Sequence, residues 1–169
     1  MEGLVIRQLV ATDAQALLAF ELENREWFET HIEARPPAFY CLEGVERHID
    51  AYLSGLAAST WHPFVIEASG GRIVGRANLK DIDLAAKRAE VGYRIARSVC
   101  GQGLATRALE HLIAQARIRW GLRQLVAYVY DENVGSKKVL GRCGFRPDLL
   151  PDDETEGVEH RYTRWLDSA

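Results

Sequence analysis

Apolar and polar positions along the first third of the chain follow two different periods. Residues 4–9 alternate between apolar and polar side chains, which predicts a first strand. Helical spacing follows from Ala14, with Asp13 placed to cap that helix, and a second helical pattern covers about residues 43–58. The proline pair inside residues 30–40 interrupts the periodicity, so that segment predicts a loop.

From residue 63 onward, strand and helix patterns alternate. The predicted strands cover residues 63–68, 72–79, 90–95 and 125–130, with another beginning at Phe145 and a last one holding residues 162–166. Gly70 and Gly71 give a hairpin turn signal between the first two of these strands. Two amphipathic helices, over about residues 104–120 and over residues 134–142, are closed by Gly121 and Gly144.

This order of elements predicts an α/β (α+β) protein. Antiparallel strands early in the chain, followed by a βαβ-like unit, indicate a mixed, mostly antiparallel central sheet of about six to seven strands with helices on both faces. The chain has 169 residues, the usual size of one domain, so we expect a single domain over residues 1–169.

Composition narrows the classes of function. The net charge of −3, with no long basic run, gives no support for a nucleic-acid-binding face. No apolar run approaches the roughly 20 residues of a membrane span, and the N-terminus lacks a signal-peptide pattern, so we expect a cytoplasmic protein. The three cysteines show no metal-ligand spacing, which favours a reducing compartment and no metal. The oligomeric state stays open, a homodimer included.

A glycine-bearing loop precedes the long helix. It reads Cys100, Gly101, Gln102, Gly103, Leu104, Ala105 and Thr106. Glycines let the backbone approach a ligand, and the free N–H groups of a helix start form an anion site suited to a pyrophosphate. A Gly-x-Gly before a helix is also common as a plain tight connection, so the loop alone leaves both interpretations open. Thr106 at the third-glycine position argues against a nicotinamide or flavin fold.

Five segments together resemble the GNAT superfamily, in its Rim-type branch that acetylates protein N-termini and other amines. They are residues 75–79, 89–95, 100–106, 131–136 and 139–145. The resemblance covers about residues 3 to 166 and implies the GNAT fold, with acetyl-CoA as co-substrate. Two departures stand out: Cys100 replaces a glutamine or arginine, and Arg94 takes a place where an aromatic residue is common.

The resemblance also implies how the cofactor is held. The loop and the helix start would bind the pyrophosphate, while residues 92–95 splay from the next strand and pair with the pantetheine like an added strand. The implied cofactor-binding set is Tyr93, Arg94, Ile95, the seven loop residues named above, Asn133, Ser136 and Lys138. Asn133 could equally serve only as a helix cap.

Catalytic roles follow from the same resemblance. Leu140 takes the place of a tyrosine acid found in many relatives, and Rim-type relatives instead carry a serine at the position of Ser136. We therefore predict that the Ser136 hydroxyl lies near the cofactor sulfur and helps protonate the leaving thiolate, although Ser136 could equally be a first-turn helical serine that bonds only the backbone. Glu90 is the first choice for the base that deprotonates the amine and Glu159 the second, although either could be a surface carboxylate.

The acceptor side gives a weaker pattern. Several aromatic residues either line an acceptor pocket or only pack: Trp27, Phe28, His31, Phe39 and Tyr40. The sequence therefore predicts an N-acetyltransferase that moves acetyl from acetyl-CoA to a primary amine, on a small molecule or a protein N-terminus. The alternatives are a GNAT-fold module that binds CoA without turnover, and a nucleotide-binding domain that uses the glycine loop.

Overall fold

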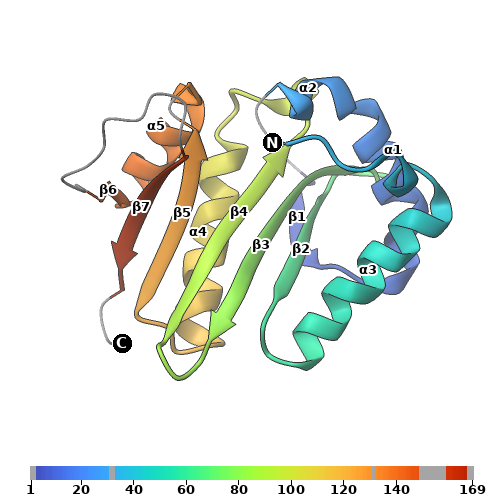
Figure 1. Cartoon of the computed structure of the whole chain (residues 1–169). Helices are drawn as coiled ribbons and strands as arrows, with labels where there is room; N and C mark the ends of the chain where they lie inside the picture. The colour runs from blue at the N-terminus through green and yellow to red at the C-terminus, as the bar shows by residue number, and fades with distance from the viewer. Residues whose placement is uncertain (1–2, 31–32, 131, 149–158, 167–169) are drawn as a thin grey trace.

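The computed structural model describes residues 3–30, 33–130, 132–148 and 159–166, whose strands form one seven-stranded sheet (Figure 1). The order of strands across the sheet is β1-β2-β3-β4-β5-β7-β6. Their bounds are β1 (Val5–Gln8), β2 (His62–Glu67), β3 (Ile73–Asp83), β4 (Arg88–Ile95), β5 (Gln124–Tyr130), β6 (Arg146–Pro147) and β7 (Glu159–Trp165). All neighbours pair antiparallel except β4 and β5, which pair parallel. The predicted mixed, mostly antiparallel sheet is confirmed.

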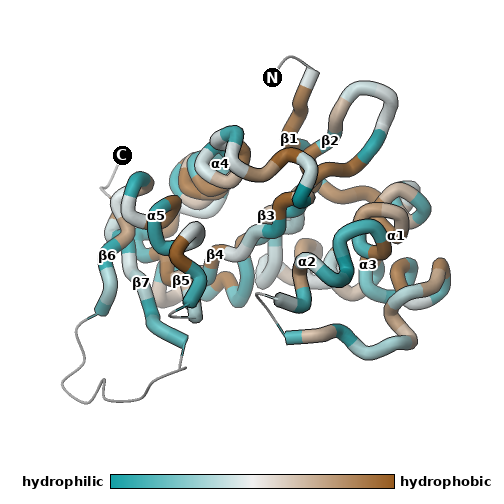
Figure 2. The backbone as a smooth tube through the Cα atoms, turned by 90° about the horizontal axis from the view of Figure 1, so that it is seen from above, coloured by the Kyte–Doolittle hydropathy of each residue, from teal (hydrophilic) through white to brown (hydrophobic). Residues whose placement is uncertain are grey.

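Helices cover both faces of this sheet, as predicted. On one face lie α1 (Ala14–Glu23), α2 (Arg25–Glu29) and α3 (Leu42–Ala57), and on the other α4 (Leu104–Ile118) and α5 (Val134–Arg142). Figure 2, which views the molecule from above, separates the two layers. Three short 3-10 helices complete the described elements: η1 (Ala11–Asp13), η2 (Pro37–Phe39) and η3 (Arg97–Val99). No helix in these described ranges is long and apolar enough to cross a membrane.

The apolar stripe of α4 explains why this helix forms and where it packs. Leu104, Ala108, Leu112 and Ala116 recur at every fourth position, and each is at most 1% exposed. The helix contacts β3 and β4 through this stripe. Burial fixes the rotation of α4, so its N-terminus lies at the end of β4, where η3 and the glycine loop connect the two elements.

Local structure differs from the sequence prediction at several points, among them the short helices α2 and η2, which were not predicted. The Asp13 carboxylate does not cap α1: it accepts hydrogen bonds from the Val10 N–H at 2.8 Å and from Arg7, so it holds the turn before the helix. The long helix ends at Ile118 rather than near residue 120. The third strand is also longer than expected, because β3 continues to Asp83 across an irregularity in its pairing with β4.

Strands β4 and β5 pair over only part of their length. The parallel register joins Arg88, Ala89 and Glu90 to Gln124, Leu125 and Val126, and no later residue of β4 has a partner on β5. β4 nevertheless continues to Ile95, paired on its other side with β3. The two strands diverge toward the top of Figure 1. The splay expected at residues 92–95 is therefore present, and it leaves the facing backbone groups of β4 without ladder partners on β5.

Buried His62 makes the stability of this fold depend on pH. The Trp120 indole N–H donates to His62 Nδ1 at 2.9 Å, so the neutral ring carries its hydrogen on Nε2, which lies 3.1 Å from Gln8 Oε1. Burial, aided by the charge of Arg119, lowers the pKa of His62 from 6.5 to about 4. A protonated ring would lose the bond from Trp120.

We expect the stability that neutral His62 contributes to be present above pH 6.5 and lost as the pH falls toward 4, because the unfolded state then binds the extra proton. The measurement is urea unfolding of the parent and of His62→Gln between pH 7.5 and 4. The difference in unfolding free energy between them should shrink by on the order of 2 kcal/mol over this range. A difference that stays constant with pH would contradict the assignment.

Candidate active site

A cavity of about 640 Å³ lies between the start of α4, the end of β4 and α5. We call it the cofactor cavity. Its wall includes all but one of the predicted cofactor-binding residues: Tyr93, Arg94, Ile95, Cys100, Gly101, Gly103, Leu104, Ala105, Thr106, Asn133, Ser136 and Lys138. Gln102 is the exception, since its exposed side chain is not part of the wall. Their binding roles stay predictions.

The glycine loop has the geometry of an anion site. Gly101 and Gly103 have φ values of 78° and 79°, a left-handed conformation that disfavours any side chain, and Gly103 caps α4. The first helical hydrogen bond runs from the Arg107 N–H to the Gly103 carbonyl. The N–H groups of residues 104–106 therefore precede the hydrogen-bonded ladder of the helix and carry its positive dipole end.

Two cationic side chains face the same cavity from α5. Lys138 and Arg142 lie one helical turn apart and both contribute to its wall. Arg142 was not among the predicted site residues, although its spacing from Lys138 would have indicated a shared helix face. Together with the helix start, these charges favour a ligand with several negative charges, such as a pyrophosphate.

Asn133 and Ser136 begin α5, and Ser136 reaches across to β4. Asn133 Oδ1 accepts from the Ser136 N–H at 3.2 Å, so Asn133 does cap the helix. The Ser136 hydroxyl shares a hydrogen bond of 2.9 Å with the Tyr93 hydroxyl. Burial raises the pKa of Tyr93, so its phenol keeps its proton at neutral pH. The sequence predicted Tyr93 in the cofactor set but did not indicate this hydroxyl pair.

A second cavity, of about 370 Å³, adjoins the first. We call it the acceptor cavity. Four residues line both cavities: Tyr93, Arg94, Asn133 and Ser136. The wall of the acceptor cavity also contains both carboxylates proposed as the base, Glu90 and Glu159. The structure thus brings Ser136 and the two candidate bases to one connected space at the point where β4 and β5 part.

Glu90 occupies a partly buried position that suits a base. It lies opposite Lys80 in the β3–β4 register, and the two charged groups are 3.7 Å apart. Burial raises the pKa of Glu90, with Asp81 and Glu159 adding to the rise while Lys80 opposes it. A carboxylate with a raised pKa accepts a proton from an ammonium group more readily near neutral pH.

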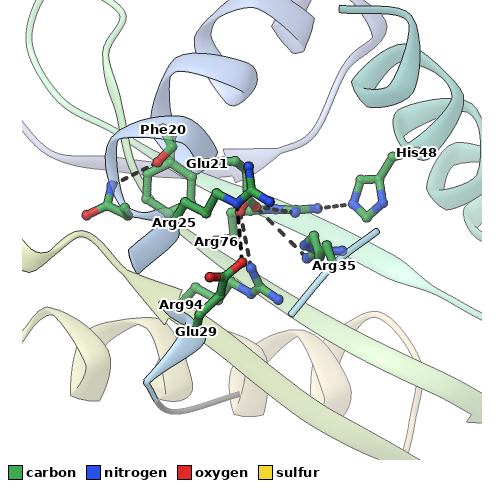
Figure 3. Close-up of polar contacts among 9 residues, drawn as sticks. Phe20, Glu21, Arg25, Glu29, Arg35, His48, Arg76 and Arg94 are labelled. Carbon is green, nitrogen blue, oxygen red and sulfur yellow. Dashed lines mark hydrogen bonds and ion pairs between the residues drawn. The ribbon is translucent and has the colours of Figure 1, made fainter. Parts of the chain in front are cut away.

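The other end of the acceptor cavity is built around Glu21, a carboxylate of α1 that is fully buried (Figure 3). Arg76 donates to Glu21 Oε1 at 2.9 Å, and Arg94 donates to Oε2 at 3.1 Å. Arg35 lies 3.9 Å from Oε1. Arg76 also donates to His48 Nε2 at 2.8 Å. Burial, with the positive charge of Arg76 and its neighbours, lowers the pKa of His48 to about 2, so His48 is neutral.

This arginine cluster was missed in the sequence, yet part of its pattern is visible there. Glu21 lies on the buried face of α1, and buried Asn24 connects α1 to α2, so both polar residues lie between apolar Leu17 and Phe28. A charged residue on an apolar helical stripe indicates a buried ion pair. What the sequence does not give is the partner, because Arg76 and Arg94 come from strands more than 50 positions away.

The aromatic residues near the first helices mostly stack on arginines. Arg25 lies over Tyr40, Arg35 over Phe39 and Arg97 over Trp27, with guanidinium-to-ring distances of 4.0, 4.6 and 5.4 Å. Trp27 and Phe28 line the cofactor cavity, whereas Phe39 and Tyr40 line neither cavity. His31 lies outside the described residues, as does Asp131. The interpretation of an aromatic acceptor pocket therefore gains no support.

A reactive thiol and a metal site are two other chemistries that the same place could offer. The Cys100 side chain contributes to the cofactor cavity, but partial burial raises the pKa of its thiol, which disfavours the reactive thiolate. Among the residues that the structure describes, no group of three or more histidine, cysteine or acidic side chains is arranged to hold a metal ion. The arrangement instead combines an anion site, a hydroxyl pair and carboxylates, which suits transfer of a group between two bound molecules.

Comparison with known proteins agrees with this geometry. Residues 3–146 match the family described as the acetyltransferase (GNAT) domain. A probable N-acetyltransferase of Bacillus subtilis, YjcK, is 30% identical over 145 residues, which cover 85% of this chain and 80% of the relative.

Two solved structures are similar over almost the whole chain. Ribosomal-protein-S5-alanine acetyltransferase from Vibrio fischeri has a TM-score of 0.88 at 20% identity, covering 99% of this chain and 95% of its own. RimJ from Mycobacterium smegmatis, solved in complex with a CoA disulfide, has a TM-score of 0.84 at 23% identity, covering 96% of this chain and 81% of its own. At these identities the likeness shows a common fold.

The Glu21 cluster yields a prediction on stability. Glu21→Gln removes the carboxylate and leaves Arg76 buried without a full counter-charge, so we expect the unfolding free energy to fall by about 3 kcal/mol in urea titrations. Glu23→Gln on the same helix is the matched control, because Glu23 pairs with Arg72 at the surface, with side chains 57% and 54% exposed. The control should change stability by less than about 0.5 kcal/mol. Equal losses in both variants would refute the buried-pair account.

Proposed function

Because the chain belongs to the acetyltransferase (GNAT) family, we propose that it moves the acetyl group of acetyl-CoA to a primary amine by direct attack in a ternary complex. The observation that carries this proposal is the junction of two cavities. Tyr93, Arg94, Asn133 and Ser136 line both, at the place where β4 and β5 part. A donor in one cavity and an acceptor in the other would meet there without a covalent enzyme intermediate.

The residues present fit coenzyme A. The left-handed Gly101 and Gly103 and the start of α4 would hold the pyrophosphate, with Lys138 and Arg142 adding positive charge. The unpaired edge of β4 would bind the pantetheine arm as an added strand. Acetyl-CoA supplies the activated acyl group as a thioester. A backbone N–H of β4 would polarise the thioester carbonyl.

Two proton movements are then required of the chain. The amine arrives as an ammonium ion, and Glu90 would take its proton, directly or through water, before the nitrogen attacks the acetyl carbon. As the new C–N bond forms and the C–S bond breaks, Ser136 would donate a proton to the sulfur. In the same step the attacking nitrogen loses its second proton, which would return to the Ser136 oxygen directly or through water, so that the neutral amide and the free thiol form together. Tyr93 would stay protonated and orient the Ser136 hydroxyl through the 2.9 Å hydrogen bond that joins the two groups.

The acceptor belongs to the amines, and two classes stay open. The similar Vibrio fischeri protein is a ribosomal-protein-S5-alanine acetyltransferase, which favours an acceptor amine on a protein. A cavity of about 370 Å³ has room for one or two residues or for a small amine. A cytoplasmic location and a homodimer stay predictions from the sequence.

The alternative is a module that binds CoA without turnover, and one assay separates the two functions. The enzyme should release free thiol from acetyl-CoA when supplied with a panel of peptides and small amines, and the acetylated amine should appear in equal amount by mass spectrometry. Thermal shifts with CoA, NAD and ATP run in parallel, because a ligand that binds the folded state raises the midpoint. A shift with CoA and no turnover on any amine would favour the module.

The role of Ser136 gives the first kinetic prediction. Ser136→Ala should lower kcat by roughly 10- to 100-fold with little change in the KM for acetyl-CoA, because the lost proton donor acts in the transition state. The helix cap survives this change, since Asn133 bonds to the Ser136 backbone N–H. Tyr93→Phe should lower kcat by a smaller factor, and Ser54→Ala, on the exposed side of α3, is the control. If Ser136→Ala kept the kcat of the parent, Ser136 would have no part in the mechanism.

The pH dependence identifies the base. Burial raises the pKa of Glu90, so the parental rate should rise with pH as this carboxyl loses its proton. In Glu90→Gln that rise disappears. The ratio of the parental rate to the Glu90→Gln rate should be largest at pH values between the pKa of Glu90 and the pKa of the amine. It should approach one above about pH 8, where an α-amine loses its proton to solvent without a base. A pH-independent deficit would contradict this role, and the same profile measured in Glu159→Gln tests the second choice.

A further inference from the structure

The arginine cluster at the inner end of the acceptor cavity carries more positive charge than the fold requires. Glu21 is fully buried and needs a counter-charge, which Arg76 provides at 2.9 Å with a side chain only 2% exposed. Arg94 and Arg35 add two further guanidinium groups around the same carboxylate, with side chains 19% and 20% exposed. Three positive charges against one negative charge leave an excess of two beside the cavity.

Neighbouring groups do not remove this excess. His48 faces the cluster from α3 as a neutral ring. Tyr52 is also uncharged, and the Arg76 guanidinium lies 5.3 Å from the centre of its ring. Glu33 also contributes to the cavity wall, and with it included one positive charge is still uncompensated. At the other end of the cavity, Lys80 is already paired with Glu90 at 3.7 Å, and Glu159, whose charge acts on Glu90, adds its negative charge at that end.

The cluster also contains buried polar atoms that lack a partner among the described residues. These atoms are Arg35 Nε, Arg76 Nε and Asn78 Oδ1, and all three residues line the acceptor cavity. Arg76 and Asn78 are 2% and 8% exposed as whole residues. A buried donor without an acceptor costs about 1–3 kcal/mol, so such atoms are typical of a site completed by a ligand.

The guanidinium groups are held in place before any ligand arrives. Arg94 lies 5.1 Å from the centre of the Phe28 ring and Arg35 lies 4.6 Å from that of Phe39, in addition to their contacts with Glu21. Stacking and the shared carboxylate restrict both side chains, which reduces the entropy lost on binding. An arginine fork matches the two oxygens of a carboxylate.

We propose that the acceptor amine carries a carboxylate group, which Arg35 and Arg94 bind above the Glu21–Arg76 pair. This inference rests on the proposed acetyl transfer and names its substrate class. Arg94 adjoins Tyr93 and lines both cavities, so the carboxylate would lie within a few bonds of the attacking nitrogen. Two sources fit: the α-carboxylate of a free amino acid, or the side chain of an aspartate or glutamate at the start of a peptide.

The test compares matched acceptors that differ only in this charge. One arm pairs free amino acids with their α-amides. The other pairs peptides beginning with Asp or Glu in their first two residues with the same peptides carrying Asn or Gln. We expect kcat/KM to be at least tenfold higher for the carboxylate member in one arm, and that arm identifies the source. Equal values within every pair would overturn the inference.

Arg35→Gln is the decisive variant, because Arg35 lines the acceptor cavity but not the cofactor cavity. It should reduce the carboxylate-to-amide ratio of kcat/KM to about threefold or less, and Arg35→Lys should restore only part of it. Arg72→Gln, at a surface pair with Glu23, should leave the ratio unchanged. A ratio that survives in Arg35→Gln would contradict the assignment.

Binding measured without turnover separates this inference from the proposed function. Calorimetric titration of the parent, saturated with CoA, should show the preferred carboxylate acceptor binding at least tenfold more tightly than its amide, and Arg35→Gln should abolish this difference. Binding of this kind without acetylation would overturn the transferase proposal and keep the carboxylate site. Acetylation of both members at equal rates, with equal affinities, would overturn the carboxylate site alone.

Discussion

The early end of the parallel pairing between β4 and β5 is the constraint on which the rest of the site depends. The pairing of β4 with β5 stops at Glu90 and Val126, whereas β4 continues to Ile95 because it stays paired with β3 on its other side. A sheet that stayed closed would pair these backbone groups with each other. Because it opens, the edge of β4 is available to a ligand, and the space beside it joins the cofactor cavity to the acceptor cavity.

Each neighbouring element adds one chemical property to that opening. The buried stripe of α4 fixes its N-terminus beside the end of β4, which brings the anion-binding loop to one side. The cap at Asn133 starts α5 so that Ser136 meets Tyr93 across the gap. On the opposite face, α1 carries Glu21 under the strands and gathers arginines from β3 and β4. Packing of ordinary apolar faces thus positions all of the polar groups.

Most of the fold could be predicted from the sequence, because its elements have strong local patterns. The bounds of α5 were predicted correctly, and the order of the strands and of α1, α3, α4 and α5 agrees with the structure, whereas the five-residue α2 was not predicted. Asp13 was misassigned because a carboxylate before a helix can cap it or bind an arginine, and only the position of Arg7 decides between the two. The cofactor cavity was also predictable, since its loop and helix start are contiguous in sequence.

The acceptor side could not be predicted in the same way. Glu21 lies more than 50 positions from both Arg76 and Arg94, and no local periodicity indicates that it meets them. The Tyr93–Ser136 hydrogen bond likewise spans 43 positions. Sequence patterns give the face on which a residue lies, whereas the partner depends on how elements pack. Charged residues on otherwise apolar helix faces, such as Glu21, were the indication of a buried ion pair that the sequence contained.

Amide hydrogen exchange with and without CoA tests the central claim most directly, because it reports on the backbone groups that the open sheet exposes. Binding should slow exchange at the N–H groups of residues 101–106 and along residues 91–95, with no change in β2, which lies two strands away from the opening. Protection confined to these two segments would establish the site independently of turnover. CoA binding that leaves both segments unprotected would contradict the account.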